Sequence, residues 1–338
     1  MEILGGGRLE VRIGPADVGK RVSVRQAVPG GAAGSRFTDA VGVLTSWDDG
    51  VLIVTRRSGE RVRVEESALV AGKVVPQTPP RRRGPAADHA ELARVSSRGW
   101  QPLETQRLGD WLLRAADGFT RRANSALPLG DPGLPLDEAL LRVRRWYAER
   151  GLTPTVQVAT GGTDTQEALA EALTAHGWTR EVSALVRVGA LAPLADAGPQ
   201  AVDRVGLSRT VDAAWLRRYQ RKGVGATALK VLGAGPSVWF ATVPGGAGDE
   251  APAAIGRCVV DGRWAGFMAV EVAPEHRRQG LARGVMAALA RRALDEGASA
   301  AWLQVETDNA PALALYDDLG FTTHHTYHHY QFRSPGQE

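Results

Sequence analysis

The sequence predicts an α/β (α+β) protein in which a small β-barrel precedes two similar units, each with a central mixed sheet. Strand-like stretches fill residues 9–76, and the order strand, strand, helix, strand, helix, strand then occurs twice. A proline- and arginine-rich stretch separates the two regions. We expect a barrel in residues 1–78, a linker in 79–95, a first unit in 96–192 and a second unit in 193–338.

The barrel is predicted from four stretches that alternate apolar and polar residues or run apolar, as β-strands do. Tight turns are expected at Asp49-Gly50 and Ser58-Gly59. Four or five short strands in this region favour a small barrel similar to SH3-like domains. The four stretches are residues 22–25, 40–45, 51–56 and 61–64.

Composition favours a chain of several globular domains, because 43% of the 338 residues are hydrophobic and 23% are charged. No apolar run approaches the ~20 residues of a membrane-spanning helix. The first residues lack the pattern of a signal peptide. Cys258 is the one cysteine, which excludes an internal disulfide. We therefore expect a cytoplasmic protein that does not bind membranes.

The net charge of +4 is unevenly distributed. Residues 1–85 hold 14 Lys/Arg and 9 Asp/Glu, a net charge of +5, whereas residues 86–338 hold 27 and 28, a net charge of −1. Part of the excess is the run Arg81-Arg82-Arg83. No aromatic residues interleave with these arginines, as single-strand binding usually needs. A solvated linker is therefore favoured over a nucleic-acid contact.

The two units are predicted from a repeated pattern. In the first copy, helix, strand, helix and alternating strand are expected at 138–151, at 156–158, up to 176 and at 181–188. In the second copy they are expected at 287–297, at 302–305, up to 319 and at 323–332. A hairpin precedes each copy, at 111–126 with a turn at Asp117-Gly118 and at 254–272 with a turn at Asp261-Gly262.

The copies differ just before their first helices. The second copy runs from a strand ending at Val272 through a proline into Arg277-Arg278-Gln279-Gly280-Leu281-Ala282, and a helical pattern follows. Backbone N–H groups and the dipole of a helix start favour an anion there. Gly280 allows close approach of phosphates, and the two arginines add charge-assisted contacts. The second copy is therefore predicted to bind phosphates.

The corresponding stretch of the first copy is Gly130-Asp-Pro-Gly-Leu-Pro135. Pro132 and Pro135 remove backbone donors, and Asp131 would repel phosphate. The first copy is expected to bind no nucleotide-like cofactor. It would support the fold or form one wall of the substrate cleft.

Residues 205–332 resemble the GCN5-related N-acetyltransferase (GNAT) superfamily. Residues 277–282 match its Arg/Gln-x-x-Gly-x-Gly/Ala pyrophosphate loop, and Asn309 followed by Leu315-Tyr316-Asp-Asp-Leu-Gly-Phe321 matches a second element. The order of an N-terminal SH3-like domain followed by tandem GNAT units looks like that of a group of actinobacterial acetyltransferases. The resemblance implies tandem GNAT units, of which the first is degenerate and lacks the cofactor loop.

The resemblance also implies acetyl-CoA as the acetyl donor, an amine acceptor and no metal. Main-chain groups of Val270 and Val272 would pair with the pantetheine arm. Asn309 would bind the cofactor or cap a helix, or do both. The N–H groups from Gln279 to Gly284 would hold the pyrophosphate; they belong to Gln279, Gly280, Leu281, Ala282, Arg283 and Gly284.

Direct attack of an amine on a thioester benefits from a base. An alkyl amine of pKa ~10 is mostly protonated at neutral pH, and reversing this costs about 4 kcal/mol. Glu271 on the cofactor strand is the first candidate base and Glu306 on the neighbouring strand is the second; a solvated strand carboxylate is the alternative for Glu271. Neither stands where several family members carry the base. Tyr316 is the family's usual acid, with a core tyrosine as the alternative.

The histidine run 324–329 is not predicted to bind a metal, because same-face histidines of a strand lie roughly 13 Å apart. Histidines lining the acceptor side of the cleft are favoured over a metal site. Two other functions stay open at this point: an acyl-CoA-binding regulator without turnover, and a scaffold whose basic SH3-like module docks an acidic partner. The acceptor class, from small amine to protein lysine, and the oligomeric state are also open.

Overall fold

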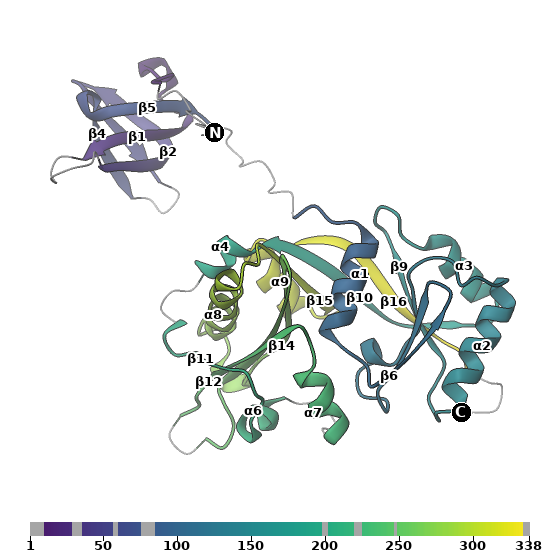
Figure 1. Cartoon of the computed structure of the whole chain (residues 1–338). Helices are drawn as coiled ribbons and strands as arrows, with labels where there is room; N and C mark the ends of the chain where they lie inside the picture. The colour runs from purple at the N-terminus through teal and green to yellow at the C-terminus, as the bar shows by residue number, and fades with distance from the viewer. Residues whose placement is uncertain are drawn as a thin grey trace, which may run out of the picture. The chain divides into compact units, whose positions relative to one another are not determined.

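The computed structural model describes residues 10–28, 36–56, 60–75, 85–197, 202–219, 225–246 and 249–333. The chain forms two compact units, Met1–Arg82 and Arg83–Glu338 (Figure 1). The predicted turn at Ser58-Gly59 and the arginine run 81–83 lie outside the described residues.

The first unit contains the small antiparallel β domain that the sequence predicts. Its sheet has the strand order β4-β3-β2-β1-β5. The turn at Asp49-Gly50 joins β2 to β3 with both residues in the left-handed region, at φ values of 49° and 75°. Buried valines and leucines, among them Leu44 and Leu52, form its core. The elements are η1 (Pro15–Asp17), β1 (Arg21–Val28), β2 (Arg36–Asp48), β3 (Val51–Thr55), β4 (Arg61–Glu65), η2 (Glu66–Ala68) and β5 (Leu69–Val74).

The second unit contains both copies of the repeat, and in each copy helix, strand, helix and strand follow in the predicted order. The first copy comprises α1 (His89–Gly99), β6 (Glu104–Leu108), β7 (Trp111–Ala115), η3 (Arg121–Ala123), β8 (Leu127–Pro128), α2 (Leu136–Ala148), β9 (Thr155–Thr160), α3 (Glu167–Ala175), β10 (Thr179–Ala190) and α4 (Leu191–Ala195). The second comprises β11 (Gly206–Ser208), α6 (Ala213–Arg218), α7 (Ala226–Gly233), β12 (Ser237–Val243), β13 (Ala254–Asp261), β14 (Trp264–Val272), η4 (Pro274–His276), α8 (Leu281–Asp295), β15 (Ala300–Glu306), α9 (Ala310–Asp318) and β16 (Thr322–Gln331).

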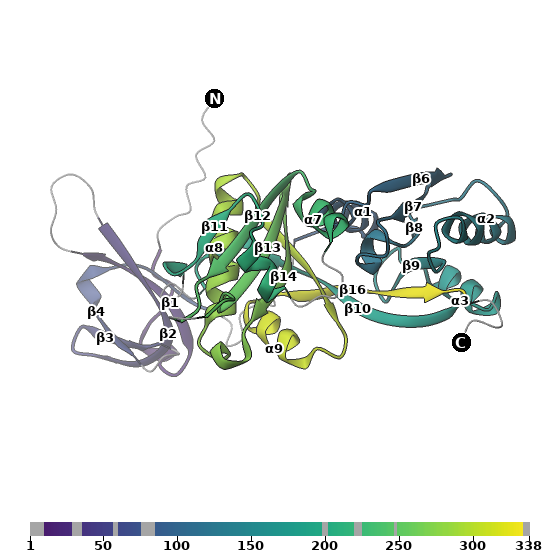
Figure 2. The same ribbon diagram turned by 90° about the horizontal axis from the view of Figure 1, so that it is seen from below.

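The last strands of the two copies are exchanged between them. One sheet of eight strands runs β11-β12-β13-β14-β15-β10-β16-β9. Strand β10 of the first copy lies between β15 and β16, and β16 of the second copy lies between β10 and β9, always antiparallel to its neighbours. Figure 2 shows β10 and β16 side by side along the length of this unit. The sequence copies 96–192 and 193–338 therefore share one sheet rather than forming separate bodies.

The predicted linker 79–95 is too long, because α1 begins at His89. The side chain of Asp88 accepts a hydrogen bond of 2.6 Å from the N–H of Glu91 and caps this helix. Leu92 and Val95 are buried in a core that both copies share. An aspartate three residues before a glutamate is a helix-start pattern that the nearby proline and arginine run obscured.

The hairpin predicted at 111–126 forms only in part, because β7 pairs antiparallel with β8, Trp111 opposite Pro128, without a tight turn. The tight hairpin lies one strand earlier, between β6 and β7, with Leu108 opposite Trp111 and the turn at Gly109-Asp110. Asp117-Gly118 lies in a wide loop, where the side-chain oxygen of Asn124 accepts hydrogen bonds from the N–H groups of Ala116 and Gly118. The second hairpin forms as predicted, with Asp261 opposite Trp264.

Candidate active site

Strands β14 and β15 separate near the middle of the large sheet. They pair in parallel only from Trp264 opposite Ala300 to Phe267 opposite Leu303. Ala269 then adopts a left-handed conformation with a φ of 51°, and the pairing of β14 with β13 shifts at the same point. A β-bulge of this kind bends its strand. The end of β14 therefore leaves β15, and a cavity opens on each side of the bend.

Opposite this bulge, α8 packs against bare backbone at Gly256. A Cβ atom at Gly256 would lie 2.4 Å from the side chain of Val285 on α8. Any larger residue would push α8 and the turn before it away from the sheet. Gly256 thus fixes the distance between the strand and the helix start that carries the candidate phosphate site.

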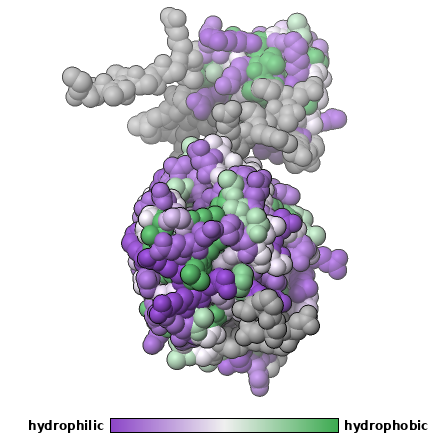
Figure 3. All heavy atoms as spheres, turned by 90° about the vertical axis from the view of Figure 1, so that its right-hand side faces the viewer, coloured by the Kyte–Doolittle hydropathy of each residue, from purple (hydrophilic) through white to green (hydrophobic). Residues whose placement is uncertain are grey.

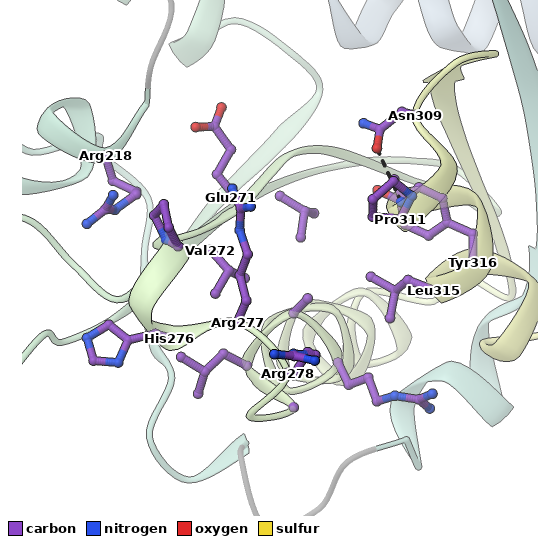
Figure 4. A pocket seen from close by; sticks show the side chains of 17 residues that line it. Arg218, Glu271, Val272, His276, Arg277, Arg278, Asn309, Pro311, Leu315 and Tyr316 are labelled. Atoms are coloured by element: carbon purple, nitrogen blue, oxygen red, sulfur yellow. Dashed lines mark hydrogen bonds between the residues drawn. The ribbon is translucent and has the colours of Figure 1, made fainter.

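The larger cavity, of about 650 Å³, lies between the end of β14, the turn before α8 and the start of α9 (Figure 4). Sequence reasoning did not find Arg218, His276 or Pro311, which also line it and belong to neither motif. The predicted residues that line it are Val270, Glu271, Val272, Arg277, Arg278, Gly280, Leu281, Ala282, Arg283, Asn309 and Tyr316.

The turn before α8 presents unpaired backbone donors to this cavity. Arg278 and Gly280 are in the left-handed region, with φ values of 61° and 77°, and no side chain caps the helix. Among the described residues, no group accepts a hydrogen bond from the N–H of Leu281, Ala282 or Arg283. First-turn N–H groups have no acceptor within their own helix. Together with the helix dipole they form an anion site.

One of the predicted phosphate ligands, Gly284, does not fit this site. The N–H of Gly284 donates to the carbonyl of Gly280 at 3.0 Å, because the fifth residue from the cap is the first to find an acceptor inside the helix. Gly284 is buried and does not line the cavity. The side chain of Gln279 donates to the carbonyl of Glu275 at 3.3 Å, and the role predicted for its main-chain N–H stays a prediction.

The charges around the turn favour an anion. Arg277 and Arg278 are exposed and form no ion pair with any residue that the structure describes. Arg283 pairs with Asp318 across α8 and α9. Arg218 donates through Nε to the carbonyl of Pro252 at 2.7 Å. Two arginines therefore stay available for charge-assisted contacts with phosphate oxygens.

Helix α9 places two side chains at this cavity, the amide of Asn309 at its N-terminus and the phenol of Tyr316. The side-chain oxygen of Asn309 accepts from the N–H of Ala312 at 3.2 Å, so Asn309 caps α9 and lines the cavity as well. Tyr316 is half-buried, and burial raises the pKa of its hydroxyl to about 12. The phenol is therefore a proton donor across the physiological range, and it faces the bend between β14 and β15.

A smaller cavity of about 250 Å³ adjoins the first and shares Val270, Glu271 and Tyr316 with it. It extends to Glu306, at the exposed end of β15. The first copy of the repeat closes it with Trp100 and Arg122. The first copy thus forms one wall of the cleft, one of the two roles suggested by the sequence, and Arg122 was not found by sequence reasoning.

The histidine run lies elsewhere. Nδ1 of His324 is 2.8 Å from Nδ1 of His325, and the His325 ring packs edge-on against His89. None of these histidines lines either cavity, so the acceptor-side role considered for them is not supported. Across the described ranges, no three His, Cys, Asp or Glu side chains are grouped to hold a metal ion. The helices of those ranges include none long and apolar enough to cross a membrane.

The loop before α2 in the first copy differs from the turn before α8. The carboxylate of Asp131 accepts a hydrogen bond from the N–H of Gly133 at 2.7 Å, so this backbone N–H is already paired within the loop. The neighbouring cavity is lined by Leu134, Leu136 and Leu169 and carries the acidic Asp164. Figure 3 shows the end of the unit with α2 and α3, where hydrophobic side chains gather among mostly hydrophilic ones.

The start of α8 after Gly280 and Tyr316 on α9 belong to the two elements by which the sequence resembles the GCN5-related N-acetyltransferases. A solved GCN5-related N-acetyltransferase from Kribbella flavida has the same fold, with a TM-score of 0.53 and 19% sequence identity over 73% of this chain and 96% of that chain. The protein is an acetyltransferase of this superfamily.

The family follows from the sequence comparisons. Residues 87–330 match the family model described as "Probable histone acetyltransferase Rv0428c C-terminal", and residues 16–73 match "Rv0428c N-terminal Sm-like domain". The Mycobacterium tuberculosis protein "Probable histone acetyltransferase Rv0428c" is 31% identical over 311 residues, 91% of this chain and 93% of that protein. The chain belongs to this family. Its first unit is therefore described as Sm-like rather than specifically SH3-like.

A shorter match concerns an enzyme with a named acceptor. The Escherichia coli "[Ribosomal protein bS18]-alanine N-acetyltransferase" is 40% identical over 52 residues, which are 15% of this chain and 35% of that enzyme.

Proposed function

We propose that the protein transfers the acetyl group of acetyl-CoA to a primary amine by direct attack, and that only the second copy binds acetyl-CoA. The observation that carries this proposal is the row of N–H groups at Leu281–Arg283 beside Arg277 and Arg278, since none of these groups is paired within the described part of the chain. A diphosphate satisfies both sets of groups at once. The names of the relatives support an amine acceptor, since histones and the alanine of a ribosomal protein offer amines.

The two cavities divide the reaction between them. The larger one holds the donor, with the edge of β14 at Val270 and Val272 beside the pantetheine arm. The amine enters through the smaller one and meets the thioester at the bend of β14. The nitrogen–carbon bond forms as the carbon–sulfur bond breaks. Glu271 takes a proton from the amine, directly or through water, and Tyr316 gives one to the leaving sulfur.

This proposal is tested with the purified protein, acetyl-CoA and a broad panel of amines, by following the release of the CoA thiol. We expect acetylated product from at least one amine. If CoA binds but no amine in the panel is acetylated, the protein is an acyl-CoA-binding regulator and the proposal is wrong.

Replacing Tyr316 with phenylalanine is expected to lower kcat by roughly 10- to 100-fold and to leave the Kd for CoA within about twofold. The leaving thiol has a pKa of ~8.5 and can depart as a thiolate, so loss of the acid lowers the rate only modestly. The wild-type rate should rise with pH as the amine loses its proton. Because the pKa of Tyr316 is about 12, the rate should not decrease at any pH up to about 10. A Tyr316→Phe variant with wild-type kcat would exclude this acid.

Glu271 and Glu306 are compared through isosteric glutamines. Glu271→Gln is expected to lower kcat/KM at pH 7 by roughly 10²- to 10³-fold, because removal of the amine proton is no longer assisted. The loss should shrink toward pH 10, where the amine is largely neutral. Glu306→Gln should cost less than about tenfold. The opposite order of losses in pH–rate profiles would make Glu306 the base.

A further inference from the structure

The smaller cavity contains charges of both signs, from the two different copies. Of the described residues that line it, only Arg122, Glu271 and Glu306 are charged. The carboxylates come from the ends of β14 and β15, whereas Arg122 lies on the short helix η3 of the first copy. An acceptor in this cavity therefore meets a cation on one wall and anions on the other.

Arg122 is held in place without a counter-ion among the residues that the structure describes. Its Nε donates to the hydroxyl of Tyr327 at 2.8 Å, and its guanidinium lies 5.9 Å from the ring centre of Trp100. It is half-buried, and no carboxylate that the structure describes pairs with it. The two Nη groups have no hydrogen-bond partner among those residues. A partly buried guanidinium needs an anion, and a fork of donors matches a carboxylate.

Gln304 adds a second unsatisfied group to the same wall as the carboxylates. Its side-chain oxygen is buried without a hydrogen-bond partner among the residues described, and the residue lines the cavity. A buried amide oxygen without a donor is costly, and an amine or its cation supplies that donor. This side of the cavity is therefore suited to the nitrogen of the acceptor.

We infer that the acceptor is an amino acid with a free carboxylate, which is bound by Arg122 while its amine faces Glu271 and the thioester. The inference rests on the proposed function and adds the acceptor class to it. The volume of about 250 Å³ suits a molecule of this size. A lysine side chain within a protein carries no carboxylate near its amine and leaves Arg122 unpaired.

The test measures kcat/KM for matched acceptors that differ in the carboxylate. The probes are lysine, ornithine, alanine and phenylalanine, with cadaverine, putrescine, ethylamine and phenethylamine as their partners. For the pair with the highest activity, the wild type should prefer the amino acid by roughly 10- to 100-fold, the effect of a charge-assisted hydrogen bond. Arg122→Gln should bring this ratio close to one, mainly by lowering kcat/KM for the amino acid.

Arg121→Gln is the matched control, since Arg121 is exposed on the same short helix and does not line the cavity. It should keep the wild-type ratio. CoA binding, measured by calorimetry, should be the same in all three proteins, which separates a local effect from misfolding. Active enzyme that prefers the decarboxylated amines, or an Arg122→Gln variant that keeps the preference, would overturn this inference alone. Failure to acetylate any amine would contradict the proposed function and this inference with it.

Discussion

Replacing Gly280 with glutamate is expected to weaken the binding of acetyl-CoA by about 100-fold or more, some 2.7 kcal/mol, and to abolish measurable acetyl transfer. Nothing lies within 4 Å of a Cβ atom at this position, so the new side chain projects into the cavity. Its carboxylate would stand beside the diphosphate, where like charges 4 Å apart repel by about 4 kcal/mol at the surface of a protein. Titration calorimetry with CoA measures the loss.

Gly297 provides a matched control for this substitution. It follows the other end of α8, has a φ of 89°, and likewise has no atom within 4 Å of the place that a Cβ atom would take. Glutamate in the left-handed region costs about 1–2 kcal/mol at either site. Gly297→Glu should therefore lose similar stability and still bind CoA. Equal binding by the two variants would show that the turn at Gly280 does not hold the diphosphate.

Deleting residues 322–338 is expected to unfold both copies of the repeat, not only the second. The deletion removes β16, which pairs with β10 and β9. Tyr327 of this strand is 2% exposed and lies in the core that contains Leu92 and Val95. Tyr330 is 6% exposed and lies in the core that contains Trp111 and Leu140. Each buried aromatic contributes about 1.5–3 kcal/mol, and two hydrogen-bonded ladders are lost as well. The sum approaches the whole stability of a typical domain, about 5–15 kcal/mol.

The control for this deletion is removal of Met1–Arg82, a compact unit with its own core. The remaining unit should keep a cooperative thermal transition, whereas the chain without β16 should keep only the transition of the unit Met1–Arg82, as followed by near-ultraviolet circular dichroism. If the chain without β16 still unfolds cooperatively in its first copy, the two copies are independent of each other. Acetyl transfer by the chain without Met1–Arg82 would in addition show that the Sm-like unit is not part of the site.

The sequence predicts the second copy well because its functional groups follow one another along the chain. The turn at Gly280 and the positions of Asn309 and Tyr316 depend on where two helices begin, which local patterns indicate. The sequence pattern does not show where the unpaired backbone N–H groups of this turn end. It extends the site to Gly284, although the N–H of this residue lies deep enough in the helix to find its own acceptor.

The features that the sequence does not predict depend on long-range contacts. Alternation identifies β10 and β16 as strands, but it cannot say that each one pairs with strands of both copies. Arg122 belongs to no motif, and it reaches the cleft only because the exchanged strands bring the copies together. The sequence predicts a linker up to residue 95, although α1 begins at His89, because the helix-start pattern stands next to a stronger proline signal.

The central claim is that the helix start after Gly280 binds a diphosphate, and a crystal structure with acetyl-CoA tests it most directly. We expect the pyrophosphate oxygens within hydrogen-bond distance, about 2.7–3.2 Å, of the main-chain nitrogens of Leu281, Ala282 and Arg283. The acetyl group should lie at the bend of β14, near Tyr316. A diphosphate bound elsewhere, with these three nitrogens facing water, would contradict the account.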